Sequence, residues 1–214
     1  GMFRDRYSKL GDIVHSAPFY VDYVRKLNID ADAELEDVPA GAVFVNANDG
    51  MMHAFDAENG QELFAYVPNL VFGHLNMLSV AEPDFRHMYY VDMTPFVKKV
   101  STDQTLLVSG LGKGGKGYFC LDVTNPWDNN EGNADEWVLW EYPNSKTDEQ
   151  QVANMGYSFS EAFIVQSYWT DSSDYSNHWI TLFGNGYASE SGTAALYVLN
   201  AKTGAPLAMI DTGR

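Results

Sequence analysis

The sequence contains a single cysteine among its 214 residues. A lone cysteine excludes an internal disulfide framework and any metal site built from several cysteines. Positive charge is also scarce, because the chain has 13 Lys and Arg but 29 Asp and Glu, which gives a formal net charge of −16. Binding to a nucleic-acid backbone depends on Lys and Arg, so this balance argues against nucleic acid as a partner. No apolar run reaches the roughly 18 residues of a membrane helix, and we expect no membrane insertion by this segment.

The remaining composition is that of a globular protein. Hydrophobic residues make up 45% of the chain and aromatic residues 14%, which is enough for one sizeable core or two small ones. Cys120 lies in the strand-like run "YFCLDV" and is expected to be buried and unreactive. The opening "GM" indicates a residue left from an expression tag before an internal Met, so we expect a segment excised from a longer protein.

Two sets of motifs recur three times along the chain. The first set places Pro or Ala before a Phe-containing strand: "SAPFYV" at 16–21, "MTPFVKKV" at 93–100 and "SEAFIV" at 160–165. The second set has a strand, a Gly-bearing loop, a strand ending in Asp or Asn, and a tight turn, at 43–60, 106–125 and 180–204. Self-similarity of this kind indicates a repeat architecture.

Each repeat predicts four antiparallel strands, which is one blade of a β-propeller. The predicted fold is therefore all-β: a single domain, 1–214, that forms a partial propeller of three four-stranded antiparallel blades with one short helix. We place blade one at about 14–67, a linker helix at about 68–80, blade two at about 87–143 and blade three at about 155–213. The predicted strands are 16–23, 42–47, 51–56, 61–66, 94–101, 104–110, 117–122, 136–142, 159–168, 178–184, 194–200 and 205–211.

The turns and insertions are also legible in the sequence. In "DAENG" we expect Asp56 to accept backbone N–H bonds while Asn59 and Gly60 adopt left-handed conformations, and "NAKTG", which ends at Gly204, repeats this turn. Polar insertions at 25–41 and 128–135 interrupt blades one and two. Loops of such length are often functional.

The stretch "GLGKGGKGY" at 110–118 matches two nucleotide-binding motifs. G-x-G-x-x-G and G-x-x-x-x-G-K bind phosphate only where the glycines follow a strand and open a helix. Here the run that follows is strand-like, and Gly117 replaces the Ser or Thr that would hold magnesium. We therefore interpret the glycines as a hairpin loop and Lys116 as a solvent-facing residue of that loop.

Candidate metal ligands are incomplete. Alternating oxygen donors at Asn28, Asp30, Asp32 and Glu34 resemble the start of a calcium loop, but Ala33 replaces the turn glycine and Pro39 replaces the bidentate Glu. A solvated acidic loop is the favoured interpretation. In "NANDG" at 46–50 the carboxylate and the Gly are each one place early for calcium, which favours a hairpin.

The histidines and tryptophans are scattered along the sequence. The five histidines show no zinc spacing, and we expect structural roles for them: His15, His53, His74, His87 and His178. His15 lies beside Asp12 and Ser16, but no G-x-S-x-G elbow supports a catalytic triad. The five tryptophans are expected to pack between blades: Trp127, Trp137, Trp140, Trp169 and Trp179.

Six motifs in fixed order carry a family resemblance. They are "LGDIVHSAPFYV" at 10–21, "VFVNANDGMMHAFDAENGQEL" at 43–63, "HMYYVDMTP" at 87–95, "LLVSGLGKGGKGYFCLDVTNPW" at 106–127, "MGYSFSEAFIV" at 155–165 and "LFGNGYASESGTAALYVL" at 182–199. In this order they resemble the C-terminal, quinoprotein-like propeller of the PilC/PilY family of type IV pilus assembly factors and tip adhesins.

The resemblance implies a non-enzymatic protein that supports pilus assembly by opposing retraction and contributes to adhesion. It implies export to the periplasm, outer membrane or cell surface and pilus tip, with pilus components or host and surface receptors as partners of the full-length protein. The family's calcium loop, of D-x-D-x-D-G type, belongs to a later blade and has no match here. We therefore expect no catalytic, cofactor-binding or metal residue in this segment, and calcium only in the full-length propeller.

Two alternatives remain open. "AFDAENGQELF" is similar to the docking turn of quinoprotein dehydrogenase propellers, although Phe64 replaces its Trp. Such an enzyme would need calcium and pyrroloquinoline quinone at the propeller centre, commonly with a vicinal cysteine pair by family analogy. The other alternative is a scaffold of the outer-membrane assembly lipoprotein type.

An open set of three blades exposes two terminal faces. We therefore expect self-association of the excised segment through blade one or blade three, or covering of those faces by the insertions at 25–41 and 128–135.

Overall fold

Three antiparallel sheets of four strands each make up the part of the chain described by the computed structural model, residues 3–27, 36–167 and 179–213. Blade one contains β1 (Phe19–Leu27), β2 (Glu36–Asn46), β3 (Met52–Asp56) and β4 (Glu62–Tyr66). Blade two contains β5 (Phe96–Ser101), β6 (Gln104–Gly110), β7 (Tyr118–Asp122) and β8 (Val138–Tyr142). Blade three contains β9 (Phe163–Gln166), β10 (Trp179–Gly184), β11 (Ala195–Asn200) and β12 (Pro206–Asp211).

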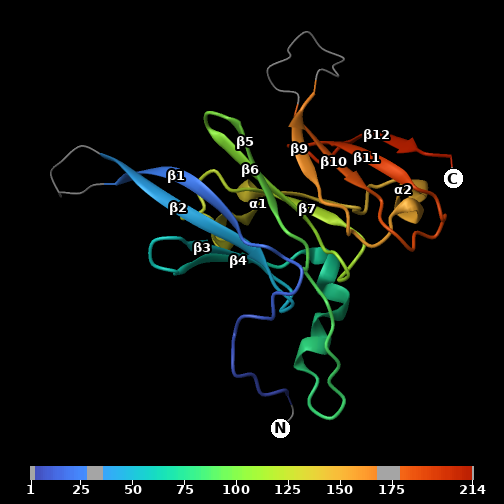
Figure 1. The fold of residues 1–214 in the computed structure, drawn as a ribbon, viewed down its shortest axis with the longest axis horizontal. Coiled ribbons are helices and arrows are strands. Elements are labelled where there is room, and N and C mark those ends of the chain that lie inside the picture. The colour runs from blue at the N-terminus through green and yellow to red at the C-terminus, as the bar shows by residue number, and fades with distance from the viewer. Residues whose placement is uncertain (1–2, 28–35, 168–178, 214) are drawn as a thin grey trace.

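Each sheet is a meander whose strands pair in chain order, and every pairing is antiparallel. The three sheets lie side by side, with blade two between blade one and blade three (Figure 1). The predicted fold class, an all-β partial propeller of three four-stranded blades, is confirmed.

The first hairpin is longer than the sequence predicts. The β1–β2 ladder runs from Phe19 opposite Phe44 to Leu27 opposite Glu36. Much of the segment 25–41, which the sequence analysis assigned to an insertion, therefore belongs to strands. Its polar composition concealed this, because backbone pairing in a hairpin continues without an apolar face.

Strand β7 lies at the centre of the core because its two faces pack against different neighbours. Phe119 and Leu121 belong to the hydrophobic cluster shared with blade one, whereas Tyr118 and Cys120 belong to the cluster shared with blade three. Alternate residues of a strand point to opposite faces, so one short strand joins both clusters. Cys120 is buried as expected, and burial raises the pKa of its thiol well above the ordinary value.

The repeated Pro/Ala–Phe motif has a structural counterpart. Phe19, Phe96 and Phe163 open the first strands of the three blades, and their rings contact edge-on in a row, with centroids 6.1 and 5.4 Å apart. Each ring thus packs toward the next blade. Phe163, the last in the row, remains 43% exposed.

The described tryptophans pack at blade boundaries, as predicted for them. Trp127 donates its indole N–H to Asp56 of blade one across 2.8 Å, and Trp137 lies 4.9 Å from the Phe64 ring. Trp140 donates to the Ala201 carbonyl of blade three across 2.9 Å. Trp179 is partly buried against the cluster between blades two and three, and Trp169 lies outside the described residues.

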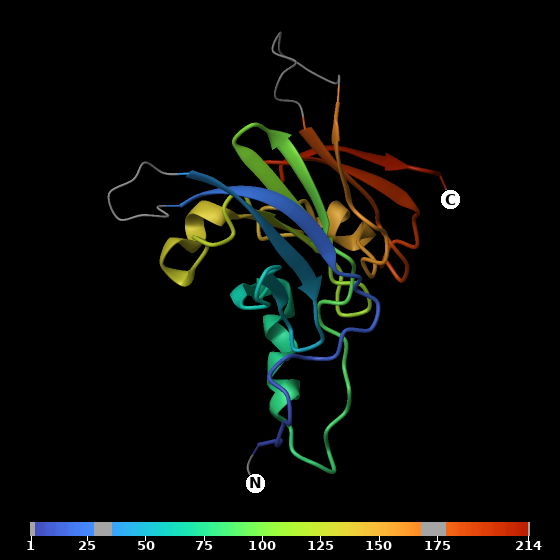
Figure 2. The same ribbon diagram turned by 60° about the vertical axis from the view of Figure 1, so that its left-hand side comes forward.

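The predicted linker helix is present as η1 (Asn69–Ser79), a run of 3₁₀ turns. Glu141 of β8 accepts the backbone N–H groups of Asn69 and Leu70, at 2.7 and 3.1 Å, and thereby caps the free donors at the helix start. Viewed from the side, η1 and the chain that follows it extend beyond the sheets, beside the N-terminal segment (Figure 2).

Three further helical segments were not predicted: η2 (Glu131–Asn133), α1 (Ala134–Trp137) and α2 (Glu149–Asn154). The first two arise from the polar insertion at 128–135. Positions 136–137 of α1 had been assigned to the strand that follows, which begins instead at Val138. Ala134 and Trp137 pack into the cluster between blades one and two. This insertion therefore covers an internal boundary and not a terminal face, contrary to one of the alternatives stated above.

The two glycine turns are confirmed, since φ is +73° at Gly60 and +67° at Gly204. Asn59 does not adopt a left-handed conformation, and that part of the prediction is wrong. Its side chain instead accepts the Gln61 backbone N–H at 2.8 Å, so Asn59 stabilises the turn by a local hydrogen bond.

Candidate functional site

Polar side chains from three distant segments converge at the edge of blade one. These are the N-terminal residues 11–16, the loop 46–50 between β2 and β3, and the chain 87–94 that enters β5. Asn48 lies at their centre and is buried. Its amide nitrogen donates to Asp12 (3.1 Å) and Asp92 (3.3 Å), and its amide oxygen accepts the Tyr90 backbone N–H (3.0 Å).

Two histidines extend this network. His15 Nδ1 lies 2.5 Å from Asp92 Oδ2, and the His15 backbone N–H also donates to Asp92. His87 Nε2 lies 2.9 Å from Asp12 Oδ2. Asp92 is buried, whereas His15, His87 and Asp12 are each about half exposed, so only the carboxylate of the first pair is shielded from solvent.

A third histidine lies on the adjoining face of blade one. His53 is buried, and its Nε2 lies 3.2 Å from both carboxylate oxygens of Asp49. Its Nδ1 lies 2.5 Å from Glu62 Oε1. Burial lowers the pKa of His53, but the hydrogen bonds and charges of Asp49 and Glu62 outweigh burial and raise the pKa above the ordinary value.

Asp12, His15 and Ser16 do not form a catalytic triad. His15 pairs with Asp92, and the Ser16 hydroxyl accepts the Asn46 backbone N–H at 3.0 Å. In blade three the equivalent Ser160 accepts the Gly184 backbone N–H at 2.9 Å. The same bond at the same place in two repeats identifies Ser16 as a structural residue of the blade.

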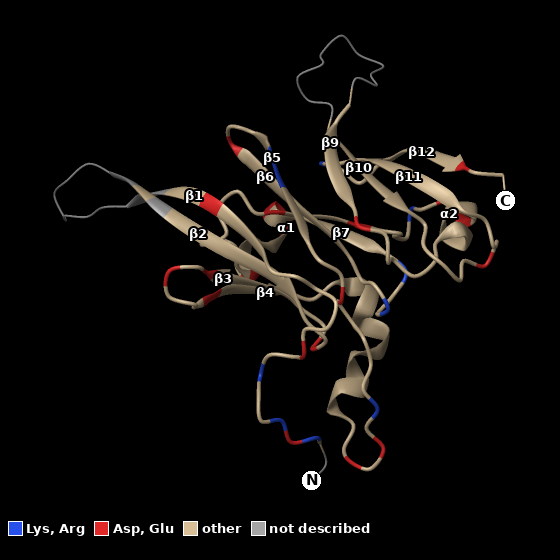
Figure 3. Ribbon diagram, viewed as in Figure 1, with Lys and Arg blue, Asp and Glu red and all other residues tan. Residues whose placement is uncertain are grey.

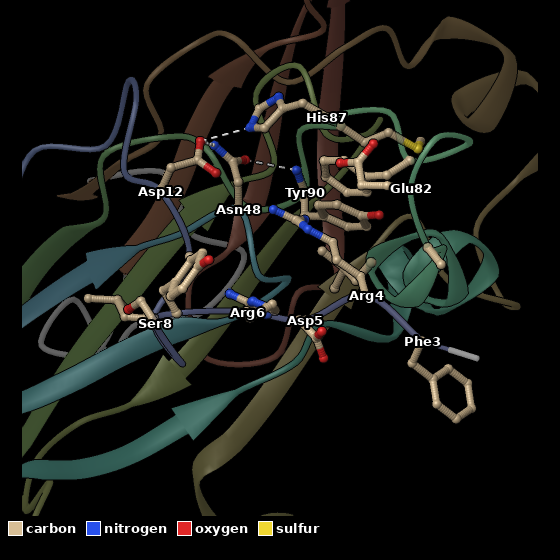
Figure 4. A pocket seen from close by; sticks show the side chains of 17 residues that line it. Phe3, Arg4, Asp5, Arg6, Ser8, Asp12, Asn48, Glu82, His87 and Tyr90 are labelled. Atoms are coloured by element: carbon tan, nitrogen blue, oxygen red, sulfur yellow. Dashed lines mark hydrogen bonds and ion pairs between the residues drawn. The ribbon is translucent and has the colours of Figure 1, made fainter. Parts of the chain in front are cut away.

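A groove of about 680 Å³ lies between the N-terminal segment and the chain that follows η1 (Figure 4). Its floor includes Asn48 and Tyr90, and its walls include Leu78 and Met88. Arg4 reaches across one wall, with its guanidinium 3.6 Å from the centre of the Phe85 ring. The groove is thus mixed in character, because charged side chains such as Arg4, Asp5 and Glu82 line it together with apolar ones.

The glycine-rich loop 110–117 connects β6 to β7, and no helix begins at Gly117. A Cβ on Gly114 would lie 1.9 Å from the Tyr90 carbonyl oxygen, and one on Gly110 would lie 2.8 Å from that of Ser158. The glycines are therefore required for close packing of neighbouring segments. The two nucleotide motifs lack the helix that phosphate binding needs.

Lys116 is not the solvent-facing residue that the sequence analysis expected. Its ammonium group donates to the Ala188 carbonyl across 2.7 Å and lies 5.8 Å from the centre of the Tyr157 ring. Lys116 therefore connects the loop of blade two to the loop of blade three. The sequence did not indicate this contact, because Ala188 is 72 positions away and has an unusual backbone conformation, with φ at +59°.

The possible calcium ligands have different outcomes. Asn28, Asp30, Asp32 and Glu34 lie outside the described residues. "NANDG" at 46–50 is a hairpin loop, as favoured, with Gly50 at φ +94°. Within residues 3–27, 36–167 and 179–213, no three His, Cys, Asp or Glu side chains are grouped in a way that could hold a metal ion.

Sequence analysis missed the pairing of His15 with Asp92 and of His87 with Asp12. The partners are 77 and 75 positions apart in the chain. The only available signal was that each pair falls within repeated entry motifs of blades one and two, "GDIVHSAP" and "HMYYVDMTP".

Residues 10–211 match the family model described as PilY1 beta-propeller domain. The chain belongs to this family. It is 37% identical to a type IV pilus biogenesis factor PilY1 homolog of Xylella fastidiosa, over 98% of this chain and 14% of that protein. It is 36% identical to type IV pilus biogenesis factor PilY1 of Pseudomonas aeruginosa, over 94% of this chain and 17% of that protein.

Among solved structures, the crystal structure of the Pseudomonas aeruginosa PilY1 C-terminal domain matches with a TM-score of 0.57 and 33% identity. That match covers 82% of this chain and 31% of the solved chain. The resemblance inferred from the six ordered motifs is thereby confirmed. This PilY1-type segment spans less than a fifth of the length of the curated relatives named above, and none of its described helices is long and apolar enough to cross a membrane.

Proposed function

We propose that this chain is the propeller segment of a type IV pilus biogenesis protein. In this role it acts as a rigid, non-enzymatic binding module that supports assembly by opposing retraction. The observation that carries the proposal is the match of residues 10–211 to the PilY1 β-propeller model, together with relatives named as type IV pilus biogenesis factors. The protein would act at the cell envelope or on the pilus, with pilus components or surface receptors as partners.

The construction of the blades supports a module that binds and transmits load. Neighbouring blades are joined by buried aromatic clusters and by bonds from Trp127 to Asp56 and from Trp140 to Ala201. The polar groups that converge near Asn48 are already bonded to one another. Such a site holds segments together, whereas a catalytic site needs a base or nucleophile directed at a substrate.

The docking-turn motif that suggested a quinoprotein enzyme has a structural use here. Phe64, which replaces the Trp of that motif, packs at 4.9 Å against Trp137, and Asp56 accepts the Trp127 indole N–H. The turn therefore joins blade one to blade two through its own side chains. Adding calcium and pyrroloquinoline quinone with a redox dye tests the enzyme alternative, and we expect neither binding nor dye reduction.

The pilus role is tested in the bacterium that carries the gene. An in-frame deletion of the region encoding residues 10–211 should abolish surface pili, and the intact full-length gene supplied in trans should restore them. A control deletion strain that carries only the empty vector fixes the background. Normal piliation of the deletion strain would refute the proposal, while a scaffold of outer-membrane assembly would instead alter outer-membrane protein levels.

A further inference from the structure

The N-terminal strap, defined here as residues 3–16, is held to the body of the protein by polar contacts. Its apolar side chains remain largely in solvent: Phe3 is 65% exposed, Ile13 41% and Val14 48%. Burial of apolar surface therefore contributes little to its attachment. Lys and Arg positions in this segment are marked in Figure 3.

Apart from an internal bond from Arg6 to the Lys9 carbonyl, the hydrogen bonds of the strap lead to the polar network at the edge of blade one or to the end of η1. The Gly11 N–H donates to Asp49 Oδ2 at 2.5 Å, and the Asp12 carbonyl accepts the Asn48 N–H at 2.9 Å. The His15 N–H donates to Asp92, and the Arg4 N–H donates to the Ser79 carbonyl at 3.1 Å. The carboxylates of Asp49 and Asp92 are thus the main anchors of the strap.

Both anchor carboxylates are paired with histidines. In the described residues every ion pair has a histidine as its cation: His15 with Asp92, His87 with Asp12, and His53 with Asp49 and Glu62. Imidazole is the side chain whose ordinary titration falls near neutral pH. Attachment of the strap therefore depends on carboxylates whose partners are imidazole groups.

The geometry around His53 requires the charged form. Its two ring nitrogens each face a carboxylate, Asp49 on one side and Glu62 on the other. A neutral imidazole carries one N–H and can donate to only one of them, whereas the imidazolium donates to both. Loss of the proton removes the positive charge beside Asp49, which is fully buried and then keeps only the backbone N–H groups of Met51 and Gly11 as donors. A buried carboxylate without a counter-charge is costly, and opening of the strap would let water reach it.

Other charged groups around these histidines are few. His15 and His87 face Tyr89, with ring centroids 5.8 and 5.2 Å apart, and Lys113 lies 4.5 Å above the Tyr89 ring. The His87–Asp12 pair is about half exposed on both sides, so its contribution is small.

We propose that the N-terminal strap is a pH-sensitive closure of the groove, locked while His53 is an imidazolium between Asp49 and Glu62 and loosened when His53 loses its proton. Opening removes the wall formed by residues 3–12 and uncovers the floor around Tyr90 and Asn48. This device does not depend on the proposed pilus function, and its test uses only the isolated chain.

Amide hydrogen exchange measured by NMR between pH 5.5 and 8.0 tests the proposal. The protection of the Gly11 amide, corrected for intrinsic exchange and divided by that of Cys120 in the core strand β7, reports local opening. We expect this ratio to fall about fivefold or more as pH rises, since a charge-assisted bond is lost. In the variant His53→Gln the ratio should be low and nearly independent of pH.

His74→Gln is the matched control, because His74 stacks on Tyr90 at 5.0 Å and forms no ion pair within the described residues. It should keep the pH dependence of the wild-type chain. If His53→Gln does not fold, Glu62→Gln at the exposed end of the pair serves instead and should weaken the pH dependence. A pH-independent ratio in the wild-type chain, or an unchanged dependence in both His53→Gln and Glu62→Gln, would overturn the proposal.

Discussion

Two glycines that close equivalent turns should respond very differently to alanine. Gly60 and Gly204 both have positive φ, and each donates its N–H to the residue that ends the preceding strand, Asp56 or Asn200, at 2.8 and 2.9 Å. Alanine at either position has the same backbone strain, about 1 kcal/mol. Any further loss of stability depends on the atoms that surround the added methyl group.

At position 60 a Cβ would meet no atom within 4 Å. At position 204 it would lie 2.5 Å from Cγ of Trp140 and 2.8 Å from its Cβ. Trp140 is 6% exposed, and its indole N–H is bonded to the Ala201 carbonyl, so the ring has little freedom to move. Overpacking of this kind adds about 1–3 kcal/mol.

We therefore expect Gly60→Ala to lower the free energy of unfolding by about 1 kcal/mol and Gly204→Ala to lower it by about 2–4 kcal/mol. Urea unfolding followed by tryptophan fluorescence measures both, provided that the m-value is unchanged. Equal losses for the two variants would show that blade three does not press its turn against Trp140. A loss at position 60 alone would refute the account of both turns.

Four further predictions follow from single contacts. Lys116→Ala should cost less than about 1 kcal/mol, because it removes one hydrogen bond and a distant ring contact, and neither ATP nor NAD should raise the melting temperature of either protein. Ala188→Gly should stabilise the protein by about 1 kcal/mol, since its φ of +59° is strained for alanine; a lower melting temperature would contradict this. The pKa of His53 is raised in the folded state, so the stabilisation that its charged form gives is complete below the ordinary pKa of 6.5 and is lost as pH rises through the folded pKa. The melting temperature of His53→Gln should therefore depend less on pH over that range than the melting temperature of the wild-type chain. Leu196 and Ile210 lie opposite each other on the outer face of blade three and are 38% and 52% exposed. Light scattering over a concentration series should show that this segment self-associates and that Ile210→Lys weakens the association. A strictly monomeric wild-type chain would refute the prediction of an open terminal face.

The strands of this fold could be predicted because their signals are local. Alternation of apolar residues, the Asp56 and Asn200 turns and the Gly60 and Gly204 positions each depend on a few neighbouring residues. β6 begins and ends as predicted, at Gln104 and Gly110, and most other boundaries agree within two residues. The larger differences are at both ends of β1 and at the starts of β2 and β9.

The polar network could not be predicted in the same way. Asp92 and His15 are far apart in sequence and come together only when blade two is docked on blade one. Lys116 was misjudged for the same reason, since its partner at Ala188 belongs to the next blade. Long-range polar contacts have no periodicity, so a single sequence does not indicate which carboxylate pairs with a given histidine in the folded chain.

The proposed role in opposing retraction is tested most directly by counting surface pili in a strain that lacks the full-length gene, with and without an active retraction motor. The account predicts few or no pili when only this gene is deleted. It predicts that pili return when the retraction motor is also inactivated, because assembly then no longer has to overcome retraction. Continued absence of pili in the double mutant would contradict the account and indicate a role in assembly that is independent of retraction.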